Sequence, residues 1–280
     1  MHKVTVICNG GISALSAFAN GKGAAVALDL PMEVMMEKEE KKRVRNLKTI
    51  ALTFSYLNSI FKCGTDYRVR IRSKIPASNG LKSSSALTLS LVEGYLRINQ
   101  IELDPETVIA HAARASIKNG TSVTGAYDDL SASFYGGMCI ADNRNRKILE
   151  RRTVSPVPVV VVADRNRRRS GDINLLDFKK LSRVSDSILR MLLQGFLYES
   201  MILNGYACGS ITGLSQNLIS EMYSMGASFS GQSGKGPAVF GVFGRREDAR
   251  AAAEKMESLG KTVRLTSFTN NGMVTHTENV

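Results

Sequence analysis

The pattern of apolar and polar residues changes its period near residue 80. Between Tyr67 and Ile75 apolar positions alternate with basic ones, a period of two that is typical of a half-buried strand. From Leu87 to Ile98 apolar residues recur at three- and four-residue spacing, which predicts an amphipathic helix. The segment P-A-S-N-G-L-K-S-S-S-A, residues 76–86, lies between the two patterns. The sequence therefore predicts a strand, a loop and a new helix in that order.

Other apolar segments predict further elements. Val159–Ala163 and Ala238–Phe243 are short apolar runs of the kind that form buried strands. The uncharged run from Val4 to Gly21 is interrupted by N-G-G, which favours a strand, a turn and a helix over the core of a signal peptide. No apolar run approaches about 18 residues, the length expected of a membrane span. We therefore expect a cytoplasmic protein with no membrane segment.

The composition suits a compact chain in two parts. The 280 residues are 43% hydrophobic, which is enough apolar content to bury one or two cores. Basic residues and two prolines between Arg151 and Pro158 separate the halves, so we expect an α+β protein with domains at residues 1–152 and 153–280. The cysteines form no C-x-x-C pair and are expected to be free thiols in a reducing compartment; they are Cys8, Cys63, Cys139 and Cys208.

Residues 76–86 combine the features of a phosphate-binding loop. The first N–H groups of the helix predicted to begin at Ser83 have no partners within the helix, and together with the helix dipole they favour an anion. Lys82 adds a positive charge. The spacing differs from G-x-x-x-x-G-K-[ST] because no second glycine precedes the lysine. An ordinary serine-capped helix after a glycine turn is the alternative interpretation.

This segment resembles the P-x-x-x-G-L-[GS]-S-S-A signature of the GHMP kinases, the superfamily of galactokinase, homoserine kinase, mevalonate kinase and phosphomevalonate kinase. Its variant with one lysine and three serines is similar to that of archaeal-type shikimate kinases. The resemblance implies that the loop wraps the triphosphate of ATP, that Lys82 neutralises phosphate charge, and that Ser84 or Ser85 helps to hold Mg²⁺. The nucleotide-binding residues implied are Pro76, Ala77, Ser78, Asn79, Gly80, Leu81, Lys82, Ser83, Ser84, Ser85 and Ala86.

A second motif supplies candidate catalytic carboxylates. Residues 127–137 read Y-D-D-L-S-A-S-F-Y-G-G. In GHMP kinases of the mevalonate type a similar run places the catalytic aspartate ahead of a double glycine, and the same count back from Gly136 gives Asp129. A carboxylate within hydrogen-bond reach orients an alcohol and accepts its proton. Asp128 is the less favoured candidate, and repulsion between the neighbours can raise one of the two pKa values. The alternative interpretation is that the two aspartates simply lie at a helix N-terminus, where acidic residues are favoured.

Two further motifs extend the resemblance. Residues 226–241 contain S-G-K-G-P-A-V-F, similar to the late glycine-rich motif of the superfamily, which implies close backbone approach beside the phosphate loop at Gly231, Gly234 and Gly236. The stretch G-K-G-A-A from residue 21 is similar to one in archaeal shikimate kinases and makes Lys22 a candidate contact for the acidic substrate or a phosphate. Asn204, in an N-G pair, is a candidate substrate contact. The alternative for the glycine-rich motif is a set of tight turns, and for Lys22 it is an ordinary surface lysine.

One departure concerns the metal. Mevalonate-type enzymes carry a magnesium-binding glutamate upstream of the catalytic aspartate, and the corresponding position here is Lys118, with no carboxylate from Thr107 to Tyr127. Asp128 or Asp129 is then a candidate for that role, because magnesium commonly uses one or two carboxylates with phosphates and waters. A kinase that relies on positioning and charge stabilisation without a protein base is also consistent with the sequence.

The net charge of +12 suits anionic partners such as ATP and a carboxylate-bearing substrate. The cluster Arg165–Arg169 either clamps a carboxylate or forms a solvated loop. A nucleic-acid-binding module that combines this cluster with Arg68, Arg70 and Arg72 is the rival class. The absence of Trp, an aromatic content of 6% and the lack of a recognisable nucleic-acid-binding motif argue against that class.

Together these resemblances imply a two-domain α+β GHMP kinase fold, with an N-terminal ATP-binding β-α domain and a C-terminal ferredoxin-like α+β domain. The resemblance implies transfer of the γ-phosphoryl group of ATP, with Mg²⁺, to a small hydroxy acid, and the archaeal-type motifs imply the 3-hydroxyl of shikimate. Homoserine kinase or another GHMP kinase is the alternative. We therefore expect ATP and shikimate as partners, and neither nucleic acid nor membrane. The motifs do not indicate the oligomeric state or the residues that hold the acceptor.

Overall fold

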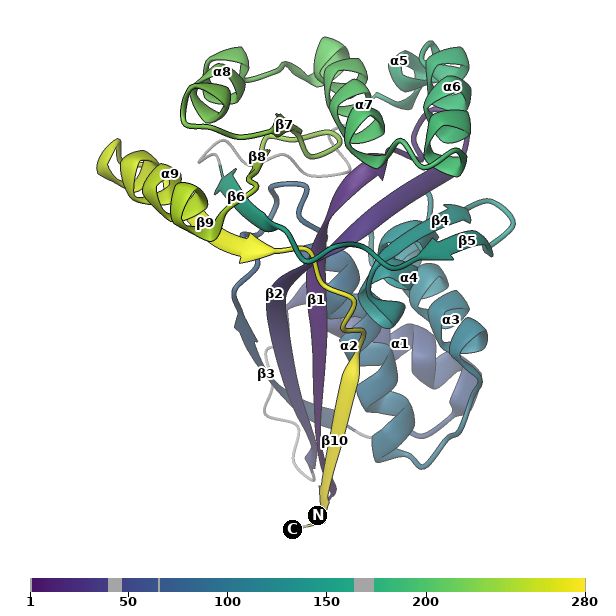
Figure 1. The fold of residues 1–280 in the computed structure, drawn as a ribbon. Coiled ribbons are helices and arrows are strands. Elements are labelled where there is room, and N and C mark those ends of the chain that lie inside the picture. Colours follow the sequence, from purple (N-terminus) through teal and green to yellow (C-terminus); the bar gives the residue numbers. More distant parts are fainter. Residues whose placement is uncertain (1, 40–46, 65, 164–173, 280) are drawn as a thin grey trace.

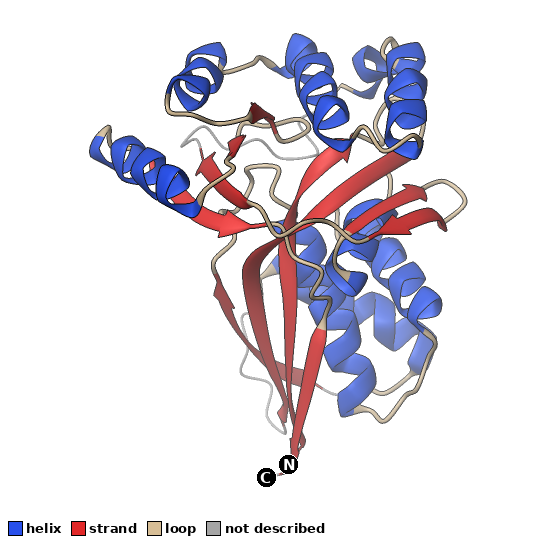
Figure 2. Cartoon of the chain, in the orientation of Figure 1, coloured by secondary structure: helices blue, strands red, loops and turns tan. Residues whose placement is uncertain are grey.

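Two antiparallel sheets, with helices packed against them, make up the computed structural model, which describes residues 2–39, 47–64, 66–163 and 174–279 (Figures 1 and 2). The strands are β1 (His2–Leu15), β2 (Lys22–Glu39), β3 (Asp66–Ser73), β4 (Met138–Asp142), β5 (Lys147–Arg152), β6 (Pro158–Ala163), β7 (Phe229–Gln232), β8 (Val239–Val242), β9 (Thr262–Ser267) and β10 (Val274–Asn279). The helices are α1 (Lys48–Phe61), α2 (Ser83–Ile98), α3 (Pro105–Lys118), α4 (Tyr127–Tyr135), α5 (Leu175–Lys179), α6 (Ser182–Leu193), α7 (Leu197–Thr212), α8 (Gln216–Ser224) and α9 (Arg246–Ser258).

The first sheet has the order β10-β1-β2-β4-β5, and β3 pairs with the far end of β2. The length of β2 allows this, because residues 22–26 pair with β4 while residues 32–39 pair with β3. Helices α1 to α4 lie together on one side of this sheet (Figure 1). The core beneath them includes Val6, Val34, Leu89 and Tyr95, all fully buried. The start of α2 and the start of α4 are thereby held against the same sheet.

The second sheet has the order β7-β8-β6-β9. Its elements follow the order strand, helices, two strands, helix, strand, which is the split β-α-β-β-α-β arrangement of ferredoxin-like domains. Helices α8 and α9 pack on it, and its core contains Val160, Met222, Phe243 and Met256. The predicted ferredoxin-like part of the fold is therefore confirmed. The last strand, β10, returns to pair with β1 in the first sheet.

Several predicted elements are confirmed: β3, α2, β6 and β8 form where the sequence pattern places them. The prediction for residues 4–21 is wrong in one respect, because β1 continues through the N-G-G segment to Leu15 and no helix follows it. The glycines serve close packing instead of a turn. A Cβ at Gly10 would lie 2.9 Å from the Leu81 carbonyl oxygen, and one at Gly11 would lie 2.6 Å from that of Val26. The pairing register shifts between Asn9 and Gly11, as at a β-bulge.

The domain division at residues 152 and 153 stays a prediction. The cluster Arg165–Arg169 lies outside the described residues. Within the described part of the chain, no helix has both the length and the apolar character needed to cross a membrane.

Candidate active site

The loop between β3 and α2 has an unusual backbone. Ser78, Gly80 and Lys82 have φ angles of 59°, 80° and 66°, in the left-handed region. For residues with a side chain this conformation is costly and is retained where the surroundings enforce it, often at functional sites. At Gly80 the surroundings also exclude a side chain, because a Cβ there would lie 2.8 Å from the Ser233 carbonyl oxygen. The loop therefore has a fixed, partly strained shape.

Neighbouring segments hold this loop by its carbonyl groups. Three hydrogen bonds do so: Gly11 N–H to Leu81 O at 3.2 Å, Ala238 N–H to Asn79 O at 3.3 Å, and the Ser233 hydroxyl to Gly80 O at 2.9 Å. Helix α2 then begins at Ser83, and its N-cap residue, Lys82, makes no capping bond with its side chain. The first N–H groups of α2 therefore remain without intrahelical partners, which is the arrangement that favours an anion.

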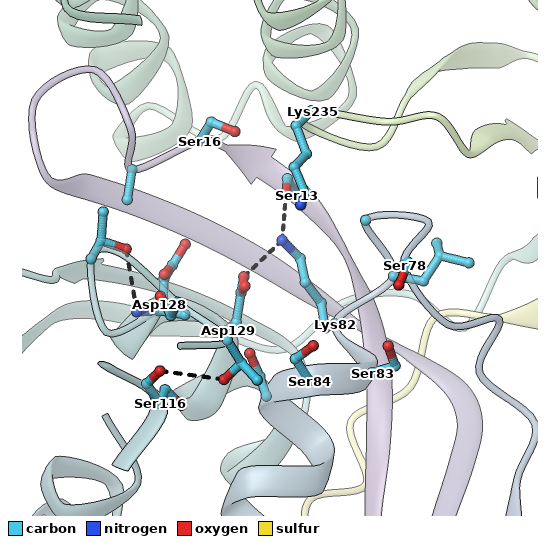
Figure 3. A pocket seen from close by; sticks show the side chains of 18 of the residues that line it. Ser13, Ser16, Ser78, Lys82, Ser83, Ser84, Ser116, Asp128, Asp129 and Lys235 are labelled. Carbon is cyan, nitrogen blue, oxygen red and sulfur yellow. Dashed lines mark hydrogen bonds and ion pairs between the residues drawn. The ribbon is translucent and has the colours of Figure 1, made fainter. Parts of the chain in front are cut away.

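A cavity of about 580 Å³ opens at the start of α2 (Figure 3). Its walls come from the end of β1 and the following turn, the start of α1, the phosphate loop, the segment between α3 and α4, and residues 233 and 235. Among the residues singled out from the sequence, those that line it are Ser78, Gly80, Leu81, Lys82, Ser83, Ser84, Ser85, Asp128 and Asp129. The other predicted residues of the phosphate loop, Pro76, Ala77, Asn79 and Ala86, are not among the described residues that line it. Hydroxyl groups are frequent on its surface, as a ligand rich in phosphate oxygens requires.

Lys82 connects the phosphate loop with the carboxylate motif. Its ammonium nitrogen lies 2.8 Å from Oδ1 of Asp129 and donates a hydrogen bond to Oγ of Ser13 at 2.5 Å (Figure 3). The side chains of Lys82 and Asp129 are 12% and 16% exposed. This ion pair is therefore shielded from bulk water but still open to the cavity. The pairing places a cation and a carboxylate together beside the helix start that favours phosphate.

Asp128 lies in a different environment from its neighbour. It is 4% exposed, its backbone N–H donates to Oδ1 of Asn143 at 3.1 Å, and its Oδ1 accepts from Nδ2 of Asn143 at 2.8 Å. Burial, reinforced by the negative charge of Asp129, raises the pKa of Asp128 to about 7, although Lys82 and Asn143 oppose this effect. The sequence-based expectation that one carboxyl of the pair is shifted upward is therefore met at Asp128.

The glycine-rich turn after β7 forms another wall. Gly234 and Gly236 have φ angles of 54° and 68°, and a Cβ at Gly234 would lie 2.6 Å from Oγ of Ser13. The turn is closed by a hydrogen bond from Gly236 N–H to Ser233 O at 2.9 Å. Gly231 lies earlier, within β7, against the ring of Phe240. The turn therefore presses against the end of β1 and points Lys235 toward Ser13 (Figure 3).

Two predicted substrate contacts have other surroundings. Lys22 begins β2, pairs with Asp142 in the sheet register, and is not among the described residues that line the cavity. Asn204, on α7, is 2% exposed and accepts a hydrogen bond from the backbone N–H of Ser16 at 2.8 Å. Since Ser16 does line the cavity, Asn204 supports the wall from behind.

Sequence patterns did not single out several cavity residues. Ser13, Ser16 and Phe18 belong to the end of β1 and its following turn, and no motif marks them. Lys235 lies within the glycine-rich motif, so its positive charge between two glycines was a usable signal. The buried Asn143 follows β4, and its importance depends on the contact with Asp128, which the sequence does not reveal.

The arginines of β3 face carboxylates across the sheet. Arg68 and Arg70 lie 3.3 Å and 4.0 Å from Glu37, and Arg72 lies 3.9 Å from Glu33. The alternating basic pattern of this strand is thus matched by acidic residues of β2.

The site combines an anion-binding helix start, a cation and a carboxylate that can accept a proton from a hydroxyl. These are the parts that phosphoryl transfer requires, so the cavity is that of a phosphotransferase. Residues 46–137 match the family described as GHMP kinases N terminal domain, and residues 190–262 match GHMP kinases C terminal.

Comparison with curated proteins agrees with the family matches. The chain is 36% identical to the shikimate kinase of Thermoplasma acidophilum, covering 98% of this chain and 97% of that protein. It is 30% identical to the shikimate kinase of Pyrococcus abyssi, covering 85% of this chain and 90% of that protein. Among solved structures, a mevalonate kinase of Methanococcus jannaschii superposes with a TM-score of 0.71 at 13% identity, covering 95% of this chain and 98% of that chain. A homoserine kinase from Cytophaga hutchinsonii superposes with a TM-score of 0.72 at 14% identity, covering 98% of this chain and 97% of that chain.

The chain belongs to the GHMP kinases. It is therefore an ATP-using kinase with an alcohol acceptor, as the phosphate loop and carboxylate motif predict.

Proposed function

We propose that this protein transfers the γ-phosphoryl group of ATP to the 3-hydroxyl of shikimate, giving shikimate 3-phosphate and ADP. The observation that carries the proposal is the contact of Lys82 with Asp129 beside the free start of α2. The choice of acceptor is supported by the 36% identity to the shikimate kinase of Thermoplasma acidophilum over nearly the whole chain.

On the donor side, the N–H groups at the start of α2 and the loop 78–82 bind the triphosphate. Their hydrogen bonds and the helix dipole hold the phosphates without a change of loop shape, because the loop is already fixed by its carbonyl contacts. Lys82, at the N-cap of α2 beside Asp129, supplies a positive charge that stabilises the transferred group electrostatically.

The residues at the helix start also fit a hard cation. Ser84 and Ser85 line the cavity at the start of α2, and Mg²⁺ takes oxygen ligands such as hydroxyls together with substrate phosphates and waters. When bound, Mg²⁺ would neutralise part of the phosphate charge that develops during transfer. The described residues contain no cluster of three or more acidic, histidine or cysteine side chains that would form a metal site without phosphate.

On the acceptor side, Asp129 orients the hydroxyl and accepts its proton. The acceptor oxygen forms a bond to the γ-phosphorus while the bond from that phosphorus to the β,γ-bridging oxygen breaks, and ADP leaves with the electron pair. The proton passes to the Asp129 carboxylate and then to solvent. The contacts of the Lys82 ammonium with Asp129 and with Ser13 hold the carboxylate and the cation in one geometry.

Lys235 provides a cation for the carboxylate of the acceptor. Its side chain points toward Ser13 from the wall that faces the start of α2 (Figure 3). Ser16, Ala17 and Phe18 line the cavity at the same end of β1, so hydroxyl and apolar groups adjoin this cation. A ring that carries hydroxyls and one carboxylate matches such a surface.

The direct test measures ADP release from MgATP with shikimate, homoserine, mevalonate, galactose or no acceptor. We expect acceptor-dependent turnover with shikimate. Turnover with another acceptor instead would reject the substrate assignment and retain phosphotransferase chemistry.

Replacing Lys235 by methionine tests the acceptor contact. Loss of a charged hydrogen bond is worth about 1.5–3 kcal/mol, so we expect the KM for shikimate to rise on the order of 10- to 100-fold while the KM for ATP stays near that of the original protein. Lys147→Met, at an exposed position on β5, is the matched control. A rise confined to the KM for ATP would assign Lys235 to the nucleotide instead.

A further inference from the structure

Helix α4, which carries Asp129, has no cap of its own. It begins after Ala126, which has a left-handed conformation (φ 51°, ψ 43°) and makes no capping hydrogen bond with its side chain. The first N–H groups of such a helix need acceptors from elsewhere. One of them, the N–H of Asp128, donates to the side chain of Asn143 at 3.1 Å. The cap of α4 is therefore supplied by a residue fifteen positions later in the chain.

Asn143 is 3% exposed and connects three segments. Its Nδ2 donates to Oδ1 of Asp128 at 2.8 Å and lies 3.3 Å from Oγ1 of Thr124, which precedes the helix. Its own backbone N–H donates to the carbonyl of Gly21 at 2.8 Å, just before β2. The side chain of Asn143 thus ties the first turn of α4 to the loop before it, and its backbone N–H anchors the residue beside the sheet.

Gly23 completes this contact from the other side. A Cβ at Gly23 would lie 2.1 Å from Oδ2 of Asp128, so the absence of a side chain lets the carboxyl pack directly on β2. Asp128 is held between Gly23 and Asn143. Successive residues of a helix point in directions about 100° apart. Fixing Asp128 toward the sheet therefore turns Asp129 toward Lys82, where the pair is 2.8 Å apart.

We infer that Asn143 is a positioning residue for phosphoryl transfer: by holding Asp128 against Gly23 it sets the rotation of α4 that keeps Asp129 on Lys82. This inference deepens the proposed function and rests on it for the role of Asp129. The contact acts through α4, and Asn143 is not among the described residues that line the cavity, so its loss changes turnover more than nucleotide binding.

The first experiment compares Asn143→Ala with Asn145→Ala. Both asparagines lie in the turn after β4, but Asn145 is exposed and bonds to Asp142. For Asn143→Ala we expect kcat to fall on the order of 10- to 100-fold, as for misplacement of a catalytic group, while the KM for ATP changes less than about 3-fold. Asn145→Ala should keep the original kcat. Equal kcat values for Asn143→Ala and the original protein, or an equal loss in Asn145→Ala, would overturn the inference.

An exchange of the two side chains separates positioning from general loss of stability. Asn143→Asp alone sets two carboxyls against each other, whereas the double variant Asp128→Asn with Asn143→Asp restores an amide facing a carboxylate. We expect Asn143→Asp to lower kcat about 10-fold or more in the original background and less than about 3-fold in the Asp128→Asn background. Equal losses in both backgrounds would reject the contact as the cause.

A crystal structure of Asn143→Ala provides a readout that needs no acceptor. Asp129 should be displaced from its 2.8 Å contact with Lys82. An unchanged contact would overturn the inference even if shikimate is the acceptor. Conversely, a displaced Asp129 would support the inference even if the acceptor panel rejected shikimate, so the two failures are distinguishable.

Discussion

Asp128 and Asp129 are adjacent in the sequence but lie in opposite surroundings in the structure. Asp129 faces the cavity and lies 2.8 Å from the ammonium of Lys82, whereas Asp128 is buried against Asn143. Burial raises the pKa of Asp128 to about 7. A carboxyl group that is costly to ionise and is hydrogen-bonded from behind suits a structural role, while the carboxylate beside a cation suits contact with the acceptor hydroxyl.

For Asp129→Asn we expect turnover to fall by at least about 100-fold, because a positioned base is typically worth about 10²–10⁴ in rate. The affinity for ATP should change little, since the N–H groups at the start of α2 keep their positions. Steady-state ADP release with varied ATP would measure both. Asp248→Asn, on the exposed face of α9, is the control, and near-normal turnover of Asp129→Asn would reject its role.

For Asp128→Asn we predict a pH-dependent gain in stability. The pKa of Asp128 is about 7 in the folded protein against an ordinary value of 3.8, so between these values the folded state binds more protons than the unfolded state. The stability of the original protein therefore falls as the pH rises through this window, by up to about 4 kcal/mol. An asparagine does not ionise and escapes this loss.

Urea unfolding near pH 5 and near pH 8 would check this prediction. The difference in the free energy of unfolding between Asp128→Asn and the original protein should shift in favour of the variant at the higher pH. A difference that is the same at both pH values would contradict it.

At the scale of elements, the G-K-G-A-A stretch acts through its glycines. The sequence resemblance makes Lys22 a candidate substrate contact, but Gly23 is the residue that meets helix α4, through Asp128. Gly10 and Gly11 similarly allow β1 to approach the phosphate loop and β2. Glycines in these two strands thus bring catalytic segments closer than any side chain would permit.

Gly23→Ala should lower the free energy of unfolding by about 1–3 kcal/mol, the usual cost of overpacking a filled site. The added Cβ would lie 2.1 Å from Oδ2 of Asp128 and 3.0 Å from Cβ of Ala17. Gly244→Ala is the control, because a Cβ there meets nothing within 4 Å. Urea denaturation of the two variants would measure this difference. Equal denaturation midpoints for Gly23→Ala and Gly244→Ala would contradict the packing argument.

At the scale of the molecule, the fold decides which thiols water can reach. All four cysteines are free, as predicted, and three of them are buried: Cys8 in β1, Cys139 in β4 and Cys208 in α7. Burial raises the pKa of Cys8 and Cys139 to about 12 and that of Cys208 to about 11, so these thiols stay protonated near neutral pH. Cys63, which follows α1, is partly exposed.

We expect a thiol reagent at neutral pH to modify Cys63 much faster than the other three, because thiolate and access are both required. Mass spectrometry after brief labelling would show one modified cysteine in the native protein and four in denaturant. Cys63→Ser should abolish the rapid phase. Fast labelling of a second site in the native protein would contradict the burial of that thiol.

Much of the fold and part of the site could be predicted because their signals are local. The change of period around residues 76–86 depends on neighbouring residues, and so does the free start of α2. The continuation of β1 through N-G-G was missed because glycine pairs usually indicate turns, whereas here distant backbone at Leu81 and Val26 requires them. Ser13, Ser16 and Phe18, which line the cavity, were missed because their place in it depends on segments far apart in the chain.

The sequence by itself determined the family, the order of strand, loop and helix at the phosphate loop, and the pair of carboxylates, since each follows from residue types at short spacing. The tertiary structure decided which carboxylate faces the lysine, why the other is buried, and which hydroxyl holds Lys82. Those outcomes depend on contacts between residues far apart in the chain, such as Ser13 with Lys82 and Asp128 with Asn143. Charge and burial at such contacts are set by packing, which no local pattern encodes.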